Sequence, residues 1–410
     1  MKRFVIFYVV AILLLTALFL ILPSCGGETS GETLYVYNWG EYISDGSEGS
    51  LDTNAEFEKY CAEELGLNVT VNYSTYSSNE DLYAKLSSGT VKYDVIIPSD
   101  YMIARLASEG MLLELNPKEN IENYEQIDER FKGLYFDPED RYSVPYTYGT
   151  IGIIYNTDMV DTQDDDFGKW SLLWDEDYAG NILQFNNPRD AFGTAQFLLG
   201  TSINSLDESE WRNALEVLKE QKSVVQGYVM DEIFNKLEGG SAALAPYYVG
   251  DFFTMYADND KLDVYYPEGA TNVFVDSMCI PYNAQNPDLA KEYINFMLSE
   301  EIAIANAEYI CYASPNKAVF ESLEYISYME EEVHPNAMSI LYDFDMDSME
   351  FYHDLPDETR MLMNELWEEL KIESSVGKTV YVTCYVIIAL IIVGAVYLYI
   401  KKKKREALYD

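Results

Sequence analysis

The chain has 410 residues, and its 70 Asp and Glu against 27 Lys and Arg give a formal net charge of −43. This excess argues against nucleic acid and anionic membrane surfaces, which are bound through Lys and Arg, and it is compatible with cationic ligands. The length predicts two or three domains, the 48% hydrophobic content excludes disorder, and only two histidines leave little room for a histidine triad or a multi-histidine zinc site.

The N-terminus has the pattern of an export signal. Two basic residues precede an apolar run at 4–22. The run ends in Leu-Pro-Ser-Cys25, which resembles a bacterial lipoprotein processing site. We therefore predict a signal over 1–25, a lipid on Cys25 and a flexible tether at 26–33. An uncleaved signal anchor is the alternative.

From residue 33 onward the pattern alternates between strands and helices. The first unit has predicted strands at 34–39, 68–73 and 94–98, and predicted helices at 54–65, 82–86 and 101–108. Ser78 and Ser99 stand where helix N-caps are expected. Strands that alternate with helices predict an α/β fold with a parallel-type sheet covered on both faces.

A second α/β unit follows Pro145. Its predicted strands lie at 150–155, 181–186, 242–245 and 272–281, and its predicted helices at 189–199, 208–221 and 287–298. Two such units predict a ligand cleft between them, at the carboxyl ends of strands. Strand position alone places Trp39, Ser99 and Asp276 near this cleft.

The C-terminus predicts a transmembrane helix. Residues 379–400 carry no charge and are long enough to cross the hydrocarbon core of a bilayer, and five cations follow at 401–405. The positive-inside rule makes 401–410 a cytoplasmic tail and leaves 26–378 outside the cell.

The cysteines and the sequence motifs indicate neither a cofactor nor a catalytic site. Apart from Cys25 and Cys384, the chain has Cys61, Cys279 and Cys311, so at most one disulfide is expected, with Cys279–Cys311 favoured. No phosphate loop, nucleophile elbow or metal-ligand spacing is present. We therefore expect no enzyme, no cofactor and no metal.

Several segments, in order, resemble the spermidine/putrescine-binding proteins of bacterial polyamine ABC importers. They include Leu-Tyr-Val-Tyr-Asn-Trp-Gly-Glu-Tyr at 34–42 and Pro-Ser-Asp-Tyr at 98–101. The other matching segments are 73–80, 83–86, 93–97, 143–146, 188–193, 275–281 and 313–316. The resemblance extends over about residues 34–371.

This resemblance implies the type II periplasmic-binding-protein fold, in which two α/β lobes close on a ligand. The chain would cross between the lobes near 146–150 and 272–274. Lobe 1 would comprise 32–145 and 274–318, and lobe 2 would comprise 146–273 and 319–376.

The resemblance also implies aromatic walls for the cleft. Trp39 and Tyr42 match a pair that sandwiches the polyamine, and Tyr101 matches a further ring. Tyr248 stands where the family has Trp, and Phe274 stands at a ring that lines the cleft. Tyr101 and Phe274 could instead be ordinary core residues.

The polar contacts implied by the resemblance are mainly carboxylates. Asp276 matches the main carboxylate for a ligand amine, Asp190 matches an acid that meets an ammonium, and Asp251 matches an acid of putrescine-type members. Ser99 would supply a hydrogen bond, and Tyr312 is a further candidate. The alternative for Asp276 is a turn cap.

The predicted function is therefore extracytoplasmic capture of a polyamine and its delivery to an ABC permease at the bacterial cell membrane. Asn187 stands where some spermidine binders have Asp, so the length of the amine stays open. A membrane-anchored sensor or scavenger for another organic cation is one alternative. A surface hydrolase is another, although no nucleophile motif favours it.

Overall fold

The computed structural model describes residues 31–375, apart from 345, 347 and 348. The predicted signal, most of the tether, the transmembrane segment at 379–400 and the tail lie outside the described residues. Within the described part, no helix combines the length and the apolar composition needed to cross a membrane.

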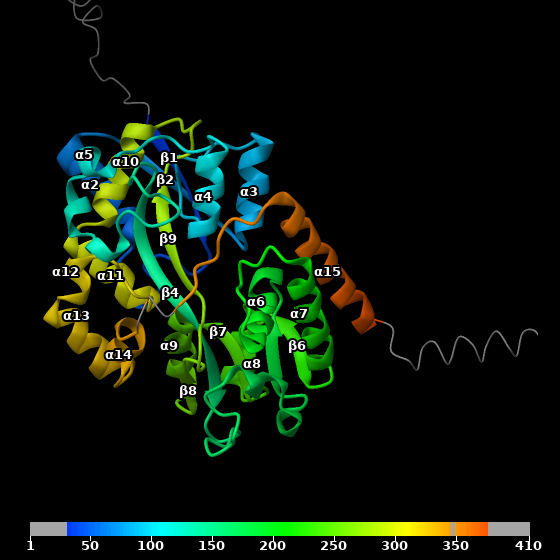
Figure 1. Cartoon of the computed structure of the whole chain (residues 1–410). Coiled ribbons are helices and arrows are strands. Elements are labelled where there is room, and N and C mark those ends of the chain that lie inside the picture. Colours follow the sequence, from blue (N-terminus) through cyan, green and yellow to red (C-terminus); the bar gives the residue numbers. More distant parts are fainter. Residues whose placement is uncertain (1–30, 345, 347–348, 376–410) are drawn as a thin grey trace, which may run out of the picture.

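One mixed sheet runs through both lobes of the molecule (Figure 1). Its strands are β1 (Glu32–Trp39), β2 (Val69–Tyr76), β3 (Val95–Ile96), β4 (Ser143–Asn156), β5 (Ile182–Phe185), β6 (Val225–Val229), β7 (Leu244–Tyr248), β8 (Leu262–Tyr265) and β9 (Val273–Cys279). The order is β2-β1-β3-β9-β4-β7-β5-β6, and β8 pairs with β4. In Figure 1 the strands β1–β3 belong to one lobe and β5–β8 to the other, while β4 and β9 run between them.

The first lobe is built as the strand and helix patterns predict. β1 pairs in parallel with β2 along its whole length, from Glu32 opposite Val69 to Trp39 opposite Tyr76, and also with β3. Buried side chains alternate with more exposed ones in the first half of β1, and its second half is more deeply buried, as expected for a strand inside a covered sheet.

The expectation of a parallel-type sheet is wrong for the middle of the molecule. β9 pairs antiparallel with β3 and β4, and β4 pairs antiparallel with β7 and β8. β4 is also one strand of 14 residues rather than a short strand at 150–155. Both of its faces are buried, so it lacks the alternating pattern that would have revealed its first half.

The predicted crossovers fall on paired residues of these two long strands. Gly149 lies opposite Phe274, and Thr150 lies opposite Val273. The ladder shifts register between Pro145 and Thr147, next to a proline that cannot donate a backbone hydrogen bond. Both chain segments at 146–150 and 272–274 therefore lie side by side at the middle of the sheet.

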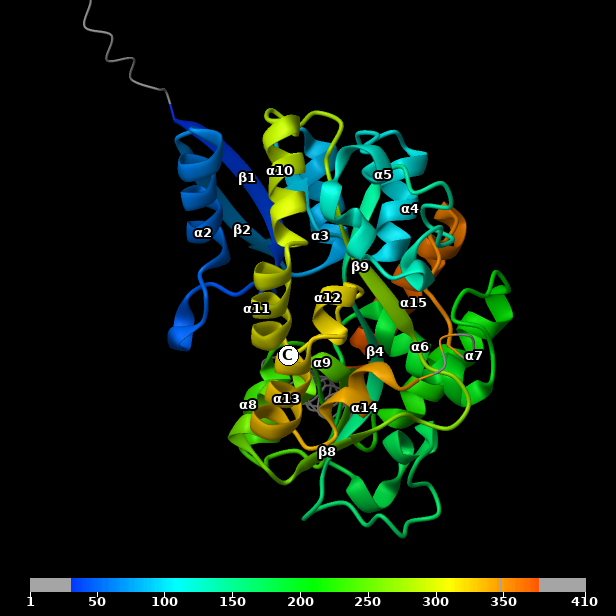
Figure 2. The ribbon, with the colours of Figure 1, turned by 90° about the vertical axis from the view of Figure 1, so that its left-hand side faces the viewer.

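Helices cover the sheet in both lobes (Figures 1 and 2). They are α2 (Thr53–Tyr60), α3 (Asn79–Ser88), α4 (Asp100–Ser108), α5 (Pro117–Asn120), α6 (Pro188–Leu199), α7 (Glu208–Gln221), α8 (Glu232–Glu238), α9 (Val249–Asp258), α10 (Pro287–Met297), α11 (Glu300–Ile310), α12 (Lys317–Phe320), α13 (Leu323–Tyr328), α14 (Ala337–Tyr342) and α15 (Asp357–Ser375). The predicted helix at 54–65 is α2 followed by a π-helical turn at Cys61–Leu65. Figure 2 shows α10 and α11 following each other beside β1 and α2.

The last described helix returns to the second lobe. α15 packs against α6 and α7, and Lys219 Nζ lies 2.8 Å from Glu369 Oε1 across this contact. Residues 351–356, before α15, form neither helix nor strand, and the Glu350 carbonyl accepts a hydrogen bond from Val273 N at 3.0 Å. Residues near 350 therefore lie against the start of β9.

The expected Cys279–Cys311 disulfide is wrong, because both thiols are free and buried, as is that of Cys61. Cys279 is held in the sheet at the end of β9, where it pairs with Ser143. Cys311 follows α11 with a left-handed backbone (φ 55°), and its thiol donates to the Glu308 carbonyl. The strand and the helix end thus give the two thiols separate surroundings.

A buried carboxylate ties β1 to the loop before α10, and its replacement is expected to destabilise the protein. Asp94 accepts backbone hydrogen bonds from Tyr35 at 3.0 Å, Gln285 at 2.7 Å and Asn286 at 2.8 Å. Asp94→Asn gives a side chain of nearly the same shape, but its NH2 group cannot accept a hydrogen bond. At least one of the three backbone N–H groups would therefore lose its acceptor. We expect the free energy of unfolding in urea to fall by about 2–3 kcal/mol. Asp165→Asn on the exposed surface is the matched control, and equal stability of the two variants would contradict this role.

Candidate ligand-binding cleft

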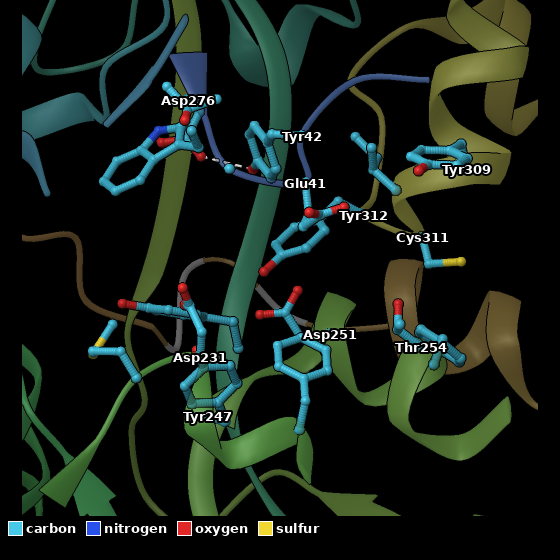
Figure 3. Close-up of a pocket in the computed structure, with 18 of the residues that line it drawn as sticks. Glu41, Tyr42, Asp231, Tyr247, Asp251, Thr254, Asp276, Tyr309, Cys311 and Tyr312 are labelled. Carbon is cyan, nitrogen blue, oxygen red and sulfur yellow. Dashed lines mark hydrogen bonds between the residues drawn. The ribbon is translucent and has the colours of Figure 1, made fainter. Parts of the chain in front are cut away.

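A cavity of about 1860 Å³ lies between the lobes and is lined by residues from both. All ten predicted site residues line it: Trp39, Tyr42, Ser99, Tyr101, Asp190, Tyr248, Asp251, Phe274, Asp276 and Tyr312. The volume exceeds that of a typical small-molecule pocket, so it includes the mouth of the cleft as well as its floor. Figure 3 shows several of these side chains converging from opposite sides.

Asp276 lies on β9 within a set of hydroxyl groups. The Tyr42 hydroxyl donates to Asp276 Oδ2 at 2.7 Å (Figure 3). It also lies 2.6 Å from Thr147 Oγ1. Ser99 pairs with Asp276 through an isolated antiparallel bridge, and the nearby Ser99 hydroxyl lowers the pKa of this carboxyl group. Asp276 is 3% exposed, yet its Oδ1 has no partner within the described part of the chain. A buried, unpaired carboxylate oxygen suits a hydrogen-bond donor from a ligand.

This arrangement bears on two expectations, that Ser99 caps a helix through its side chain and that Asp276 could cap a turn. Ser99 is the N-cap residue of α4, but its side chain makes no capping hydrogen bond and instead meets Asp276. Asp276 lies inside β9 and caps no turn.

A second carboxylate, Asp190, lies in the first turn of α6. The Tyr248 hydroxyl donates to Asp190 Oδ2 at 2.7 Å, and the Tyr352 hydroxyl donates to the neighbouring Arg189 carbonyl at 3.2 Å. The neighbouring Arg189 is buried, with its guanidinium 4.6 Å from the Tyr352 ring centre. Arg189 Nη2 donates to the His353 carbonyl at 3.0 Å. The guanidinium thus attaches the 352–353 segment to α6.

Aromatic rings form the walls between these acids. The ring pairs, with their centroid distances, are Trp39–Tyr76 (4.6 Å), Tyr42–Tyr312 (5.2 Å), Tyr248–Phe274 (5.6 Å), Phe274–Tyr312 (6.2 Å) and Tyr101–Tyr352 (6.4 Å). Tyr101 and Phe274 are only half-buried and face the cavity, so neither is an ordinary core residue. Ring faces of this kind attract cations and cover methylene groups.

The charge of the cavity wall is strongly one-sided. Its carboxylates are Glu41, Glu80, Asp81, Asp100, Asp190, Asp231, Asp251, Asp258, Asp260, Asp276, Glu308 and Glu332. Among the described lining residues, Arg189 is the only Lys or Arg. A wall of this sign selects for cationic ligands and against anionic ones.

Burial raises the pKa of the three predicted acids. Loss of hydration brings the pKa of Asp190 to about 6, that of Asp251 to about 7 and that of Asp276 to about 6. Hydrogen bonds from Tyr248, Tyr312 and Tyr42 act in the opposite direction. A cation that entered the cleft would stabilise the ionised forms and lower all three values.

Several lining residues carry no local sequence signal that marks them as part of the site. Arg189 was part of a matching segment, but its position in the wall depends on α6 and on the distant 352–353 segment. Tyr352 lies in a stretch that forms neither helix nor strand and falls outside the segments that match the family. Glu80 and Asp231 are exposed acids in an acidic chain, and only the fold distinguishes them from the rest.

One group in the described part of the chain has the spacing of metal ligands. The carboxylate oxygens of Asp164, Asp166 and Asp175 lie within 4.8 Å of one another. None of the three lines the cleft, so a metal there would not touch a ligand in the cavity.

A two-lobed α/β fold around an acidic, aromatic cleft defines a solute-binding protein. Family comparison agrees, because the model of bacterial extracellular solute-binding proteins matches residues 55–331. The chain belongs to this family, whose members bind solutes for ABC transporters rather than transform them. The surface-hydrolase alternative therefore loses its basis.

Individual relatives match most of the chain. It is 33% identical to the spermidine/putrescine-binding periplasmic protein of Salmonella typhimurium, over 77% of this chain and 87% of the relative. It is 29% identical to the putrescine/cadaverine-binding protein of Pseudomonas aeruginosa, over 84% and 95%. Its structure matches the spermidine/putrescine ABC transporter substrate-binding protein PotD from Streptococcus pneumoniae with a TM-score of 0.67 and 31% identity, over 83% of this chain and 99% of that chain.

The raised pKa of Asp276 predicts a pH-dependent cost to stability without ligand. Because the folded protein takes up this proton at a higher pH than the unfolded chain does, the ionised group destabilises the fold above about pH 6. Asp276→Asn removes that charge. In urea titrations we expect its free energy of unfolding, relative to the parent, to rise between about pH 4 and 6 by up to about 3 kcal/mol.

Above about pH 6 the difference in free energy of unfolding between Asp276→Asn and the parent should stay constant, and below about pH 4 it should disappear. Asp165→Asn controls for the loss of a surface carboxylate. A variant that is less stable than the parent at pH 8 and relatively more stable at pH 4 would show that the sign is wrong.

Proposed function

We propose that this protein captures a di- or polyamine outside the cell and delivers it to an ABC permease. The observation that carries the proposal is the set of Asp190, Asp251 and Asp276, which line one cavity among aromatic rings. Asp190 and Asp276 each accept a hydrogen bond from a tyrosine hydroxyl. The names of the relatives from Salmonella typhimurium and Pseudomonas aeruginosa support the same class of ligand.

The chemistry of the cleft suits a flexible chain of methylenes with an ammonium at each end. One ammonium would donate to Asp276 Oδ1, and another would reach Asp190 or Asp251. Charge-assisted hydrogen bonds contribute about 1.5–3 kcal/mol each. The rings of Trp39, Tyr42 and the other wall residues add about 0.5–2 kcal/mol per cation–π contact.

We assign residues 32–145 and 274–318 to lobe 1, and residues 146–273 and 319–376 to lobe 2. In this division Asp276 lies on lobe 1, and Asp190 and Asp251 lie on lobe 2. A dication that binds both sides links the lobes and favours their closed arrangement. Closure excludes water and thereby strengthens every charge interaction in the cleft.

Removal of Asp276 is expected to abolish tight binding. Asp276→Ala leaves a buried ammonium unpaired, at a cost of about 3–5 kcal/mol, which raises Kd more than about 100-fold. The measurement is calorimetric titration of the full-length protein in detergent with putrescine, spermidine and spermine, and with arginine as a non-polyamine ligand.

Asp165→Asn should bind like the parent. Equal affinity of Asp276→Ala and the parent would show that the assigned site is wrong. If the folded parent bound none of the amines, the proposed ligand class would be wrong.

The segments at the two ends of the sequence suit a protein held beside its permease. We propose a lipid on Cys25, a membrane span at 379–400 and a short cytoplasmic tail. With these anchors the ligand-binding lobes face the outside of the cell. The same anchors also suit a sensor, which is the second candidate.

Uptake in the bacterium distinguishes transport from sensing. Deletion of the gene is expected to abolish high-affinity uptake of radiolabelled amine, because the permease is no longer supplied with captured ligand. The parent gene should restore uptake, and Asp276→Ala should not. Unchanged uptake after deletion, in a protein that binds the amine, would favour the sensor.

A further inference from the structure

The ring of Tyr312 packs unusually closely against the backbone of Gly250 in the second lobe. Tyr312 follows α11, and Gly250 lies in the first turn of α9. A methyl group added at Gly250 would lie 2.3 Å from Tyr312 Cδ2, 2.4 Å from Cε2 and 2.6 Å from Cγ. Cγ is bonded to Cβ and does not move when the ring rotates about the Cβ–Cγ bond. Such a rotation would therefore not relieve the contact between Cγ and a methyl group at residue 250. The ring can therefore occupy this position only because residue 250 has no side chain.

Other contacts hold the ring in the same place. A methyl group at Gly149 would lie 3.2 Å from Tyr312 Cδ1, so the backbone of β4 also lies close to the ring. The Tyr42 ring meets it edge to face, with centroids 5.2 Å apart, and the Phe274 ring lies 6.2 Å away. Cys311, with its left-handed backbone, turns the chain from the end of α11 into the cavity. Tyr312 is 5% exposed, so these neighbours enclose most of its side chain.

The cavity continues beyond this ring. Asp276 and Tyr42 lie on one side of Tyr312 in Figure 3, and Cys311, Thr254 and Tyr309 lie on the other. Along α9 the lining residues Asp251, Thr254 and Asp258 follow one another on one face at successive turns. Glu308 and Tyr309, in the last turn of α11, line the same part of the cavity. We call this part, beyond Tyr312 and along α9, the branch.

We propose that the Tyr312 ring, packed against Gly250, is the end wall of the part of the cavity that contains Asp276 and Tyr42. We call this part the amine chamber, and we propose that the ring sets the length of the amine that it accepts. This inference rests on the proposed function, since it concerns the length of the same ligand. Gly250 is a positioning residue, because it acts through the ring of Tyr312 and not through contact with the amine. An amine longer than the chamber must displace this ring, which three elements hold in place. Without the ring, the chain of such an amine continues into the branch along α9.

The test compares affinities for short and long amines in full-length protein in detergent. Putrescine and spermine are titrated by calorimetry, and the quantity compared is the ratio of the two Kd values, putrescine over spermine. Tyr312→Ala is expected to raise this ratio at least about tenfold, because spermine gains the branch while putrescine loses a wall. Tyr312→Phe keeps the ring and is expected to leave the ratio within about twofold of the parent.

Two glycine variants test whether the position of the Tyr312 ring depends on its packing against Gly250. Gly250→Ala is expected to change the ratio more than about threefold, because the added methyl group displaces the ring. Gly227→Ala in β6 is the matched control, since a methyl group there meets no atom within 4 Å and the backbone is not left-handed. This variant should bind both amines like the parent.

An unchanged ratio in folded Tyr312→Ala, as judged by circular dichroism, would overturn the inference. If that variant did not fold, an unchanged ratio in Gly250→Ala would overturn it equally. Either result, with a parent that binds amines, leaves the proposed function intact. A folded parent that bound neither amine would overturn the proposed function itself.

Discussion

The structure of the cleft depends on the partial burial of negative charge without a matching positive charge. Asp276 is almost fully withdrawn from water, and one of its oxygens has only a ligand to meet. Hydroxyl groups of Tyr42 and Ser99 compensate part of the lost hydration, but neither carries a positive charge. Such a site is costly until a cation arrives, and this difference in free energy is what makes binding selective.

The position of Asp276 in the fold extends this electrostatic effect to the whole molecule. The residue lies on β9, opposite Thr147 of β4, and these two strands run between the lobes. Tyr42, from the first lobe, contacts both Asp276 and Thr147. A charge bound at this point therefore acts where a small change in the two strands alters the approach of one lobe to the other.

Much of this architecture was predictable from the sequence, and the failures have a common physical cause. The strands and helices of the first lobe have periodic burial and clear capping residues, so their positions were confirmed to within a few residues. β4 was predicted too short because both of its faces are buried, and periodicity disappears when no face is exposed. Its antiparallel pairing with β9 joins residues more than 100 positions apart, and local patterns carry no information about such pairs.

The site shows the same division between local and long-range information. Trp39, Ser99 and Asp276 were placed near the cleft by strand position alone, and the other seven residues came from resemblance to a family. Neither source predicts that the Tyr312 ring lies against the backbone of Gly250, or that Arg189 attaches the 352–353 segment to α6. Those contacts arise only when separate elements come together.

The overall acidity takes on a specific meaning in this light. Most acidic residues in the described part of the chain are exposed, so solvent and salt compensate their charge. In the cleft wall, the exposed acids such as Glu80 and Asp231 form an outer field that attracts cations from solution. Asp190 and Asp276 lie deeper, where screening is weak and each hydrogen bond to an ammonium is stronger than at the surface. Residues of one chemical type thus perform two tasks, attraction and tight binding, because the fold gives them different exposure to water.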